Sequence, residues 1–565
     1  MNSAKMAGLR RRELLAGAGV VALVSALPAR AANVTYGELG GEEIVLTIAR
    51  GTVAMKGGRA QAVTINGTVP GPLLRLREGR RVRITVRNTL DEPTSIHWHG
   101  LLVPFQMDGV PGLSFPGIGP GESFTYDFVP RQSGTYWYHS HSGLQEFSGM
   151  YGPLVIEPAG GAAQGREHVV VLSDHSFVAP ARILRNLKLD PGYYNRNRQT
   201  LGGLLAGKDQ PAADRLEWAR MRMDPTDIAD VTGRVLTYLV NGRDPDAPWT
   251  GLYTPGEAVT LRLINAGAMT IFNVRIPGLP LQVVAMDGQP VVPVDVDELQ
   301  LSPGETCDVV IRPGDGAHAL VCESVDRSGM AVGMIAPREG LRAPVPALRQ
   351  RPILTMRDMG MDMGGTGMSH GGGMDMAAMG HSMAMRDGNN APQVRLGPGV
   401  EMIAPMPVDR TGDPGLGLDA RYVPAGHRVL TYRDLVSPVP NPDVRPAERE
   451  IEVHLTGSMD RYMWSMDGKT MSEAHEPIPL RNGERVRFTL VNDTMMAHPI
   501  HLHGHYFELV TGHGERSPRK HTVSVLPGGK VSFDTTAEAG DWAFHCHMFL
   551  HMAMGMMRVV QVRPA

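Results

Sequence analysis

The chain has 565 residues and carries 55 Lys and Arg against 58 Asp and Glu, a formal net charge of −3. Its length predicts three or four domains of about 100 to 200 residues, and its balanced charge offers no basic face, which excludes nucleic acid as a partner. The 34 Met and 21 His against 12 Phe, 13 Tyr and 6 Trp favour a metal that binds thioether and imidazole, copper first.

The first segment, residues 1–31, has the order of a targeting signal for export. Three arginines at 10–12 precede an apolar run that ends at Leu27, and Ala29-Arg30-Ala31 follows. The pair Arg11-Arg12 before Glu13-Leu14-Leu15 resembles a twin-arginine signal, although the Ser or Thr before the pair is missing. The run is too short for a bilayer core of about 30 Å, and no later segment has the roughly 20 apolar residues of a membrane helix. We expect export to the periplasm by the twin-arginine route, without a membrane anchor.

Beyond this segment the residues alternate as in β-strands, and a helical period is scarce outside roughly residues 200–223. One pattern recurs three times: an Asn-Gly or Asp-Gly pair, a second glycine, and a strand that ends in asparagine, at residues 66–88, 241–265 and 467–492. In each copy a later strand follows a glycine, Gly134, Gly316 or Gly540. The repeat predicts three homologous β-domains, residues 32–160, 161–340 and 426–565, with a linker at 341–425.

Two of the copies carry histidines spaced two residues apart. The pairs are His97 and His99, His139 and His141, His501 and His503, and His545 and His547. Because side chains two apart on a strand point to the same face, each pair presents two imidazoles in one direction, giving eight nitrogen ligands in all. The middle copy has Phe272-Asn273-Val274 and Val321-Cys322-Glu323 instead. We expect it to hold no metal there, and Cys322 to be structural.

Cys546 lies between two of these histidines and therefore faces the opposite side of its strand. Its companions on that side are His498, His551 and Met556. Two imidazoles, a thiolate and a weak axial thioether are the ligands of a blue-copper site, which passes single electrons. The backbone of Cys546 would join this site directly to His545 and His547.

These motifs resemble those of the multicopper oxidases: His-Trp-His-Gly at 97–100, Tyr-His-Ser-His at 138–141, His-Pro-x-His-x-His at 498–503, and His-Cys-His at 545–547 with His551 and Met556 following. The resemblance covers nearly the whole chain after the export signal. It is greatest to the three-domain copper-resistance oxidases of the bacterial periplasm, because of that signal, the Met-rich insert and Arg461-Tyr462-Met463-Trp464-Ser465. It implies an all-β fold of three cupredoxin-like (plastocyanin-like) Greek-key β-sandwich domains with a flexible Met-rich insert.

The resemblance also implies four copper ions. A type 1 copper is held by His498, Cys546, His551 and Met556, with His498 as the edge where electrons enter. A type 2 copper is held by His97 and His501, and a type 3 pair by His99, His139, His141, His503, His545 and His547. The cluster of three is expected between the first and third domains. His505 and His521 match no ligand position, so we expect them to be hydrogen-bonded framework residues.

Reduction of dioxygen to water consumes protons, and Asp108, shortly after the first histidine pair, is the candidate catalytic carboxylate that relays them. The dipeptide Asp108-Gly109 is also a common turn, so a purely structural role stays open. Some relatives carry an acid just after the histidine that corresponds to His551. This chain has Met552 there, and a second relay carboxylate is left unassigned.

Residues 356–385 hold ten methionines among Gly, Asp, His370 and His381: Met356, Met359, Met361, Met363, Met368, Met374, Met376, Met379, Met383 and Met385. Many glycines and few bulky groups predict a flexible linker. Repeated thioethers at irregular spacing also match the soft ligands that select Cu(I), so we expect this segment to capture extra, labile Cu(I). Met495 and Met496, with Asp493, either guide Cu(I) to the type 1 site or pack in the core.

The remaining cysteines, Cys307 and Cys322, flank the turn Pro313-Gly314-Asp315-Gly316, and a hairpin would bring them opposite each other. In an oxidising compartment they form either a disulfide or two buried thiols.

Three functions are weighed. The leading one is a multicopper oxidase that couples one-electron oxidation of a donor, Cu(I) in periplasmic copper resistance, to four-electron reduction of dioxygen to water. The alternatives are a copper-sequestering protein, which would not need the wired Cys546, and a laccase acting mainly on phenols or aromatic amines. Copper nitrite reductase is disfavoured, because it does not need four histidine pairs in one chain. We expect a monomer.

Overall fold

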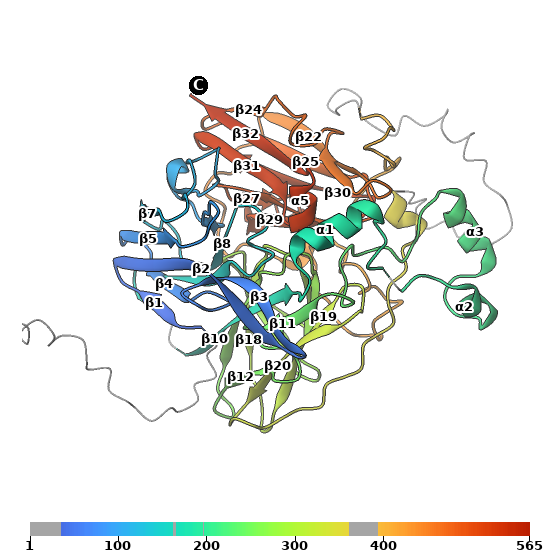
Figure 1. The fold of residues 1–565 in the computed structure, drawn as a ribbon, viewed down its shortest axis with the longest axis horizontal. Coiled ribbons are helices and arrows are strands. Elements are labelled where there is room, and N and C mark those ends of the chain that lie inside the picture. The colour runs from blue at the N-terminus through green and yellow to red at the C-terminus, as the bar shows by residue number, and fades with distance from the viewer. Residues whose placement is uncertain (1–35, 162–164, 196, 361–393, 565) are drawn as a thin grey trace, which may run out of the picture. The chain divides into compact units, whose positions relative to one another are not determined.

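Each of the three repeats forms two β-sheets around a hydrophobic core (Figure 1). The computed structural model describes residues 36–161, 165–195, 197–360 and 394–564. Strands dominate and helices are few and short, so the predicted all-β fold of three β-sandwiches is confirmed. Figure 1 draws the first repeat in blue, the second in green to yellow and the third in orange to red.

Neighbouring strands within each sheet are often far apart in the chain. In the first sandwich, one sheet contains, in spatial order, β1 (Glu38–Gly40), β4 (Leu73–Arg77), β9 (Tyr151–Glu157), β8 (Gly134–His139) and β6 (His97–His99). The other sheet contains β3 (Gly58–Ile65), β2 (Glu43–Met55), β5 (Val82–Asn88) and β7 (Ser123–Phe128). In the second sandwich, one sheet contains β11 (Thr237–Val240), β10 (Arg166–His175), β13 (Val259–Asn265), β18 (Thr306–Ile311), β15 (Leu281–Met286) and β16 (Gln289–Val296). The other sheet contains β12 (Trp249–Leu252), β20 (Met330–Ala336), β19 (His318–Ser324), β14 (Phe272–Arg275) and β17 (Glu298–Leu301). In the third sandwich, one sheet contains β23 (Met463–Met466), β22 (Arg449–Ser458), β25 (Arg485–Asn492), β30 (Gly529–Thr536), β27 (Phe507–Leu509) and β28 (Arg519–Lys520), with β21 (Val408–Asp409) paired to β30. The other sheet contains β24 (Ile478–Arg481), β32 (Met557–Arg563), β31 (Gly540–Cys546), β26 (His498–Leu502) and β29 (Thr522–Val525).

Strand β5 shows why these segments pair as strands with one buried face. Val82, Ile84 and Val86 are buried, while Arg83 and Arg87 between them are exposed. This period of two matches the pleat, which sends successive side chains to opposite faces. The apolar face therefore packs in the core and the charged face meets water.

The asparagine that ends the central strand of each repeat fixes the loop before the next strand. In the third repeat the Asn492 side-chain amide donates to the carbonyl oxygens of Met496, at 2.6 Å, and Val525, at 2.9 Å. Asn88 and Asn265 make the corresponding bonds in the other repeats. Because buried backbone carbonyls need partners, this repeated asparagine holds each loop in place. In the first and third repeats that loop leads to the histidine strand.

In the described part of the chain the helices are α1 (Pro180–Leu189), α2 (Leu201–Leu205), α3 (Ala212–Arg220) and α5 (Phe549–Ala553), with 3-10 turns η1 (Phe105–Met107), η2 (Met356–Met359), η3 (Tyr432–Asp434) and η4 (Gly514–Arg516). Helices α2 and α3 lie in the stretch 200–223 that the sequence marks as helical. Helix α1 lies outside it. There Pro180 occupies the first turn, and Ile183 and Leu187, four residues apart, supply a narrow buried stripe.

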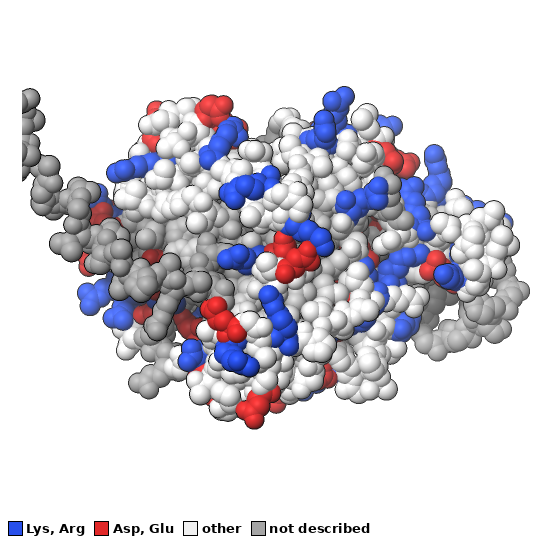
Figure 2. Space-filling model, turned by 60° about the horizontal axis from the view of Figure 1, so that its bottom comes forward, with Lys and Arg blue, Asp and Glu red and all other residues white. Residues whose placement is uncertain are grey.

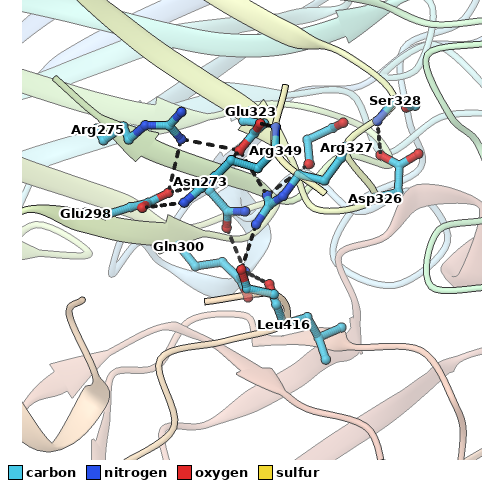
Figure 3. Close-up of polar contacts among 12 residues, drawn as sticks. Asn273, Arg275, Glu298, Gln300, Glu323, Asp326, Arg327, Ser328, Arg349 and Leu416 are labelled. Atoms are coloured by element: carbon cyan, nitrogen blue, oxygen red, sulfur yellow. Dashed lines mark hydrogen bonds and ion pairs between the residues drawn. The ribbon is translucent and has the colours of Figure 1, made fainter. Parts of the chain in front are cut away.

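The middle repeat has a buried ion-pair network where the other two have histidines. Strand register pairs His97 with His139 and His501 with His545, and the corresponding pair in the middle repeat is Arg275 with Val321. Figure 3 shows Arg275 joined to the carboxylates of Glu298 and Glu323, which are fully buried. A guanidinium thus stands where the first and third repeats carry an imidazole. The middle repeat keeps the sandwich and has lost those ligand positions.

This network also anchors both ends of the predicted linker. On the side before the Met-rich segment, Arg349 Nη1 donates to Glu298 at 2.9 Å and its Nη2 lies 2.7 Å from Glu323. On the side after it, His427 Nε2 contacts Glu298 at 2.9 Å and Arg327 donates to the carbonyl of Gly417 at 2.8 Å. The flanks of the insert are therefore packed on the middle sandwich, whereas residues 361–393 lie outside the described part of the chain.

Cys307 and Cys322 are buried free thiols in this structure. Cys307 lies on β18 and Cys322 on β19, which belong to different sheets, so the hairpin that would have set them side by side does not form. Burial raises the pKa of both thiols above the usual range. Of the two alternatives weighed for this pair, the structure has the thiols.

Among the described residues, no helix has the length and apolar character needed to span a bilayer. The face shown in Figure 2 carries basic and acidic side chains interspersed across it, with much uncharged surface between them. The export signal predicted for residues 1–31 lies outside the described residues.

Candidate metal centre

Eight histidines from the first and third sandwiches converge on one buried volume. The four pairs lie on or directly after β6, β8, β26 and β31. Rings from the two sandwiches stack on each other: His97 on His503 with ring centres 3.8 Å apart, and His99 on His501 at 3.9 Å. Seven of the eight are buried, and His141 is partly exposed. The structure therefore brings together all the histidines predicted for the three-copper cluster.

Within this volume the ligand nitrogens fall into small groups. His141, His503 and His545 have ligand atoms within 4.8 Å of one another, and so do His97, His501 and His503. The Nε2 atoms of His503 and His545 lie 3.0 Å apart. The ring of His547 lies 4.7 Å from that of His99 and 5.1 Å from that of His139.

Hydrogen bonds on one nitrogen of each ring determine which nitrogen is left for a metal. His97 Nδ1 donates to the Asp108 carbonyl at 2.8 Å and His501 Nδ1 to the His521 carbonyl at 2.6 Å, so Nε2 is left in both rings. His99 is turned the other way, with Nε2 against Thr522 Oγ1 at 3.2 Å and Nδ1 left. Such second bonds fix the tautomer and the orientation of metal-binding histidines.

The nitrogens left over fit copper. His97 Nε2, His99 Nδ1, His139 Nε2, His141 Nε2 and His501 Nε2 are buried and have no hydrogen-bond partner in the described structure, and neither ring nitrogen of His547 has one. Unpaired buried polar atoms are unfavourable, and bound metal ions would satisfy together the many that converge on this one volume. Imidazole is a preferred ligand of copper.

Six of the eight cluster histidines are held neutral, as metal binding requires. Burial, reinforced by the neighbouring imidazoles, lowers the pKa of His99, His141, His501, His503 and His547 well below the usual range. Burial lowers the pKa of His545 to about 3. A neutral imidazole keeps a lone pair on the nitrogen that faces the cluster, so these rings are ready ligands at neutral pH.

Asp108 connects ligands from both sandwiches. Its Oδ2 lies 2.9 Å from His503 Nδ1, and its Oδ1 lies 3.3 Å from His97 Nδ1. The turn character is present too, since Gly109 has φ 86° and a Cβ there would stand 1.8 Å from the Ile96 carbonyl oxygen. Asp108 therefore occupies a turn that requires glycine next, and its carboxylate touches two of the predicted copper ligands.

Glu146 is a buried carboxylate that the sequence reasoning missed. Its Oε2 lies 2.7 Å from His139 Nδ1, and its Oε1 lies 3.9 Å from His547 Nδ1. The available signal was its place five residues after His141, in the turn that follows the strand. Glu146 thus touches ligands of the first and third sandwiches, as Asp108 does on another side.

On the opposite face of β31, Cys546 meets its predicted companions. Its Sγ lies 3.5 Å from His498 Nδ1 and 3.7 Å from His551 Nδ1, and these two nitrogens are 3.1 Å apart. Met556 is fully buried, and its backbone bonds to Cys546 and His551. Burial raises the pKa of the Cys546 thiol and lowers the pKa of His551 to about 3. His498, Cys546 and His551 thus bring together the two imidazoles and the thiol of a blue-copper centre, with the predicted axial residue Met556 bonded to two of them through its backbone.

The outer nitrogens of the two type 1 histidines meet different partners. His498 Nε2 lies 2.7 Å from the hydroxyl of Thr494, whereas His551 Nε2 lies 2.6 Å from the carboxylate of Asp230. Trp464 stacks on His551 with ring centres 4.0 Å apart. His498 is fully buried, so the direct edge predicted for electron entrance is covered by Thr494.

A cavity of about 360 Å³ lies beside this site. Thr494 and Trp464 line it, and its wall includes residues 190–192, before α2, together with Ala219 at the end of α3 and residues 222–224 after it. Its carboxylates and thioethers come from six acidic residues and four methionines: Asp190, Asp224, Asp227, Glu401, Asp460, Asp493, Met223, Met402, Met459 and Met495. Two cationic side chains, Arg198 and Arg222, also line it. The wall is anionic and rich in thioether.

The two methionines predicted to guide Cu(I) lie differently. Met495 lines the cavity, while Met496 is fully buried and packs in the core. Asp493 lines the cavity as well and is tied down by His454 Nδ1 at 2.7 Å and the Ala404 amide at 2.7 Å. Burial, with the neighbouring Asp230 and Asp224, raises the pKa of Asp227 to about 8.

The Met-rich segment is described only at its start. Met356 and Met359 form η2, where Met359 is 3% exposed and Met356 packs against the core. The other eight predicted Cu(I)-capturing methionines, Met361, Met363, Met368, Met374, Met376, Met379, Met383 and Met385, lie outside the described residues. His505 is buried and hydrogen-bonded through both ring nitrogens, as a framework residue is. His521 Nδ1 lies 3.1 Å from Thr522 Oγ1, but its Nε2 is buried without a hydrogen-bond partner in the described structure. His521 also has a ligand atom within 4.8 Å of those of His99 and His501, so the framework role of this residue stays a prediction.

The chain matches models of the multicopper oxidase family at residues 47–161, 209–337 and 444–565. It therefore belongs to the multicopper oxidase family and is an oxidoreductase. Within the family it is similar to a Copper resistance protein A homolog of Pseudomonas syringae pv. tomato, 48% identical over 93% of each chain. Copper resistance protein A of Escherichia coli is 46% identical, again over 93% of each chain.

Solved structures share the fold. The multicopper oxidase from Pseudomonas thermotolerans is 22% identical with a TM-score of 0.58, and the match covers 93% of this chain and 100% of that one. The laccase from Botrytis aclada is 21% identical with a TM-score of 0.63, covering 94% of this chain and 88% of that one.

Proposed function

We propose that this multicopper oxidase takes its electrons from Cu(I) and serves copper resistance in the periplasm. The observation that carries the proposal is the cavity beside Cys546, His498 and His551, whose wall holds six acidic residues, two arginines and four methionines. Thioether selects Cu(I), and carboxylates attract a cation. A phenol would be better accommodated by an apolar, aromatic-lined cleft. The likeness to copper resistance proteins A supports the role in copper resistance.

We assign four copper sites to the ligands described above. A type 1 copper would be held by His498, Cys546, His551 and Met556; a type 2 copper by His97 and His501; and a type 3 pair by His99, His139, His141, His503, His545 and His547. When bound, type 1 copper exchanges single electrons, and the three-copper cluster reduces dioxygen to water with four. The chain's own task is to orient these ligands, exclude bulk water and supply protons.

Cys546 connects the two parts of this machinery. Its side chain faces His498 and His551, and its backbone continues directly into His545 and His547 on the other face of the strand. On the donor side, Thr494 and Trp464 line the cavity and contact His498 and His551 respectively. We infer that electrons from the cavity reach the type 1 ligands through these two residues.

Asp108 is the proposed proton-relay residue at the cluster. Its Oδ2 accepts from His503 Nδ1 at 2.9 Å, which leaves Oδ1, buried and without a hydrogen-bond partner in the described structure, to carry a proton inside the volume where dioxygen is reduced. Glu146 is assigned a positioning role, because its Oε2 lies 2.7 Å from His139 Nδ1, the nitrogen that is hydrogen-bonded to the Ser140 carbonyl at 3.1 Å, and so helps to keep Nε2 of that ring toward the cluster.

The donor is tested with variants of the cavity. The double variant Met459→Leu, Met495→Leu keeps apolar volume and removes two thioethers, so KM for Cu(I) should rise about tenfold or more while a phenolic donor is oxidised as before. Met471→Leu, an exposed methionine outside the cavity, is the matched control. An unchanged KM for Cu(I) in the double variant would remove the proposal.

The proposal extends to the export, the domain boundaries and the oligomeric state of the protein. Residues 1–31 would direct export by the twin-arginine route. The three sandwiches would be domains 32–160, 161–340 and 426–565, with 341–425 between them and its methionines capturing labile Cu(I). The protein would act as a monomer. Copper sequestration alone is disfavoured, because storage does not require Cys546 to be wired to His545 and His547.

A further inference from the structure

We propose that Asp230 is a positioning residue of the type 1 site that holds His551 and lowers the reduction potential of the bound copper. The inference rests on the type 1 assignment made above and deepens it, since a low potential restricts the enzyme to easily oxidised donors. Nothing in the spacing of the copper motifs points to Asp230. The inference rests on contacts that the fold creates between the middle and third sandwiches.

The contact is short and fully buried. Asp230 Oδ2 lies 2.6 Å from His551 Nε2, and both side chains have 0% exposure. The other ring nitrogen of His551 faces Cys546 and His498. A neutral imidazole that presents Nδ1 to a metal carries its proton on Nε2, so His551 donates and the Asp230 carboxylate accepts.

No cationic side chain competes for this carboxylate. Among the described residues, no Lys or Arg forms an ion pair with Asp230, and its Oδ1 has no hydrogen-bond partner. The second contact of Oδ2 is the neutral hydroxyl of Tyr462, at 3.2 Å. In its ionised form the carboxylate therefore directs its charge mainly at His551, in surroundings of low dielectric where the effect is large.

The two type 1 histidines are consequently unlike. His498 has a neutral hydroxyl, Thr494, at its outer nitrogen, whereas His551 has a carboxylate. A carboxylate that accepts the outer N–H raises the basicity of a metal-bound imidazole. A more basic ligand stabilises the higher charge of Cu(II) relative to Cu(I). The site is therefore harder to reduce, and its potential is lower.

Asp230 belongs to the segment between α3 and β11, in the middle sandwich. The same segment supplies Asp224 and Asp227 to the wall of the donor cavity. The middle sandwich, with ion pairs in its own ligand positions, thus contributes both to the donor cavity and to the type 1 site. A Cu(I) donor held by this wall would meet a copper centre whose potential is set by the same stretch of chain.

The test is a redox titration of the blue absorption of the copper-loaded protein. Asp230→Asn keeps the shape and the acceptor oxygen but removes the charge, so the type 1 equilibrium should shift about tenfold or more toward the reduced form, about 59 mV for one electron. Asp230→Glu, which keeps the charge, should restore part of the shift. Asp326→Asn is the matched control, because it removes another buried acid of the middle sandwich that contacts no copper ligand and does not line the donor cavity. This control variant should have the same reduction potential as the native protein.

A potential within error of the native protein in Asp230→Asn, with the blue band retained, would overturn the proposal. Should that variant fail to load copper, Tyr462→Phe provides a second test of opposite sign. It removes the hydroxyl that shares Oδ2, strengthens the bond to His551, and should lower the potential; an unchanged or higher potential contradicts the proposal. The titration needs no donor, so its outcome is independent of whether Cu(I) is the substrate.

Discussion

Asp108 Oδ2 lies 2.9 Å from Nδ1 of His503, which joins a turn of the first sandwich to a predicted copper ligand of the third. The contact spans 395 positions of the chain. A carboxylate in this place can orient the ring and hold a proton beside the cluster.

Replacing Asp108 tests the relay. Asp108→Asn keeps the size of the side chain and removes the acid, so reoxidation of the fully reduced enzyme by dioxygen should slow about 100-fold while the blue band is kept. Stopped-flow recovery of that band measures it. Asp315→Asn, in the exposed dipeptide Asp315-Gly316, is a matched control for the turn role. Reoxidation of Asp108→Asn at the native rate would show that Asp108 has only a structural role in its turn.

Glu146 should affect the copper content of the cluster. Glu146→Gln weakens the hold on His139 Nδ1, and second-sphere partners of metal ligands are worth about 10- to 100-fold in metal affinity. Copper analysis after dialysis against a chelator should show cluster copper lost before type 1 copper. Glu42→Gln, at an exposed position, serves as control. Equal retention of copper in both variants would rule out the positioning role.

Much of this site follows from spacing alone, and some of it cannot. His97, His99, His501 and His503 share one face because strands repeat every two residues, and Cys546 must then face the other way. Asp230 and Glu146 carry no comparable signal. Asp230 lies 321 positions before His551, and only the packing of the middle sandwich on the third brings them together.

The middle repeat illustrates another limit. The sequence showed that this repeat lacks the histidines. It could not show the role of Arg275 and Glu323, because their ion pairs depend on strand register and on Arg349 from the following segment. Helix α1 was missed for a related reason, since two buried residues in ten give little periodicity.

The ion-pair network should contribute to stability. Arg349→Met leaves the fully buried Glu298 and Glu323 short of a partner, and removing one member of a buried pair destabilises a protein by about 3 kcal/mol or more. Urea unfolding of the two proteins measures the difference. The exposed Arg342→Met should change the free energy of unfolding little. Equal destabilisation by both substitutions would contradict the role of the network.

Asp227 should make stability fall as pH rises. Its pKa is raised from 3.8 to about 8 by burial and by Asp230 and Asp224, so between these values the folded state keeps a proton that the unfolded state has lost. That contribution is present in full below about pH 4 and is lost as pH rises toward 8. Unfolding of copper-free protein at pH 5 and pH 8 should differ less in Asp227→Asn than in the native chain. An identical pH dependence would show that Asp227 is not protonated in the folded state.

Dioxygen uptake with Cu(I) as the only reductant is the most direct test of the proposed function. The copper-loaded protein should consume one dioxygen for every four Cu(I) oxidised, without release of peroxide, and should oxidise a phenolic donor more slowly. Blue protein that shows no Cu(I)-dependent uptake, or that turns over phenols far faster than Cu(I), would contradict it.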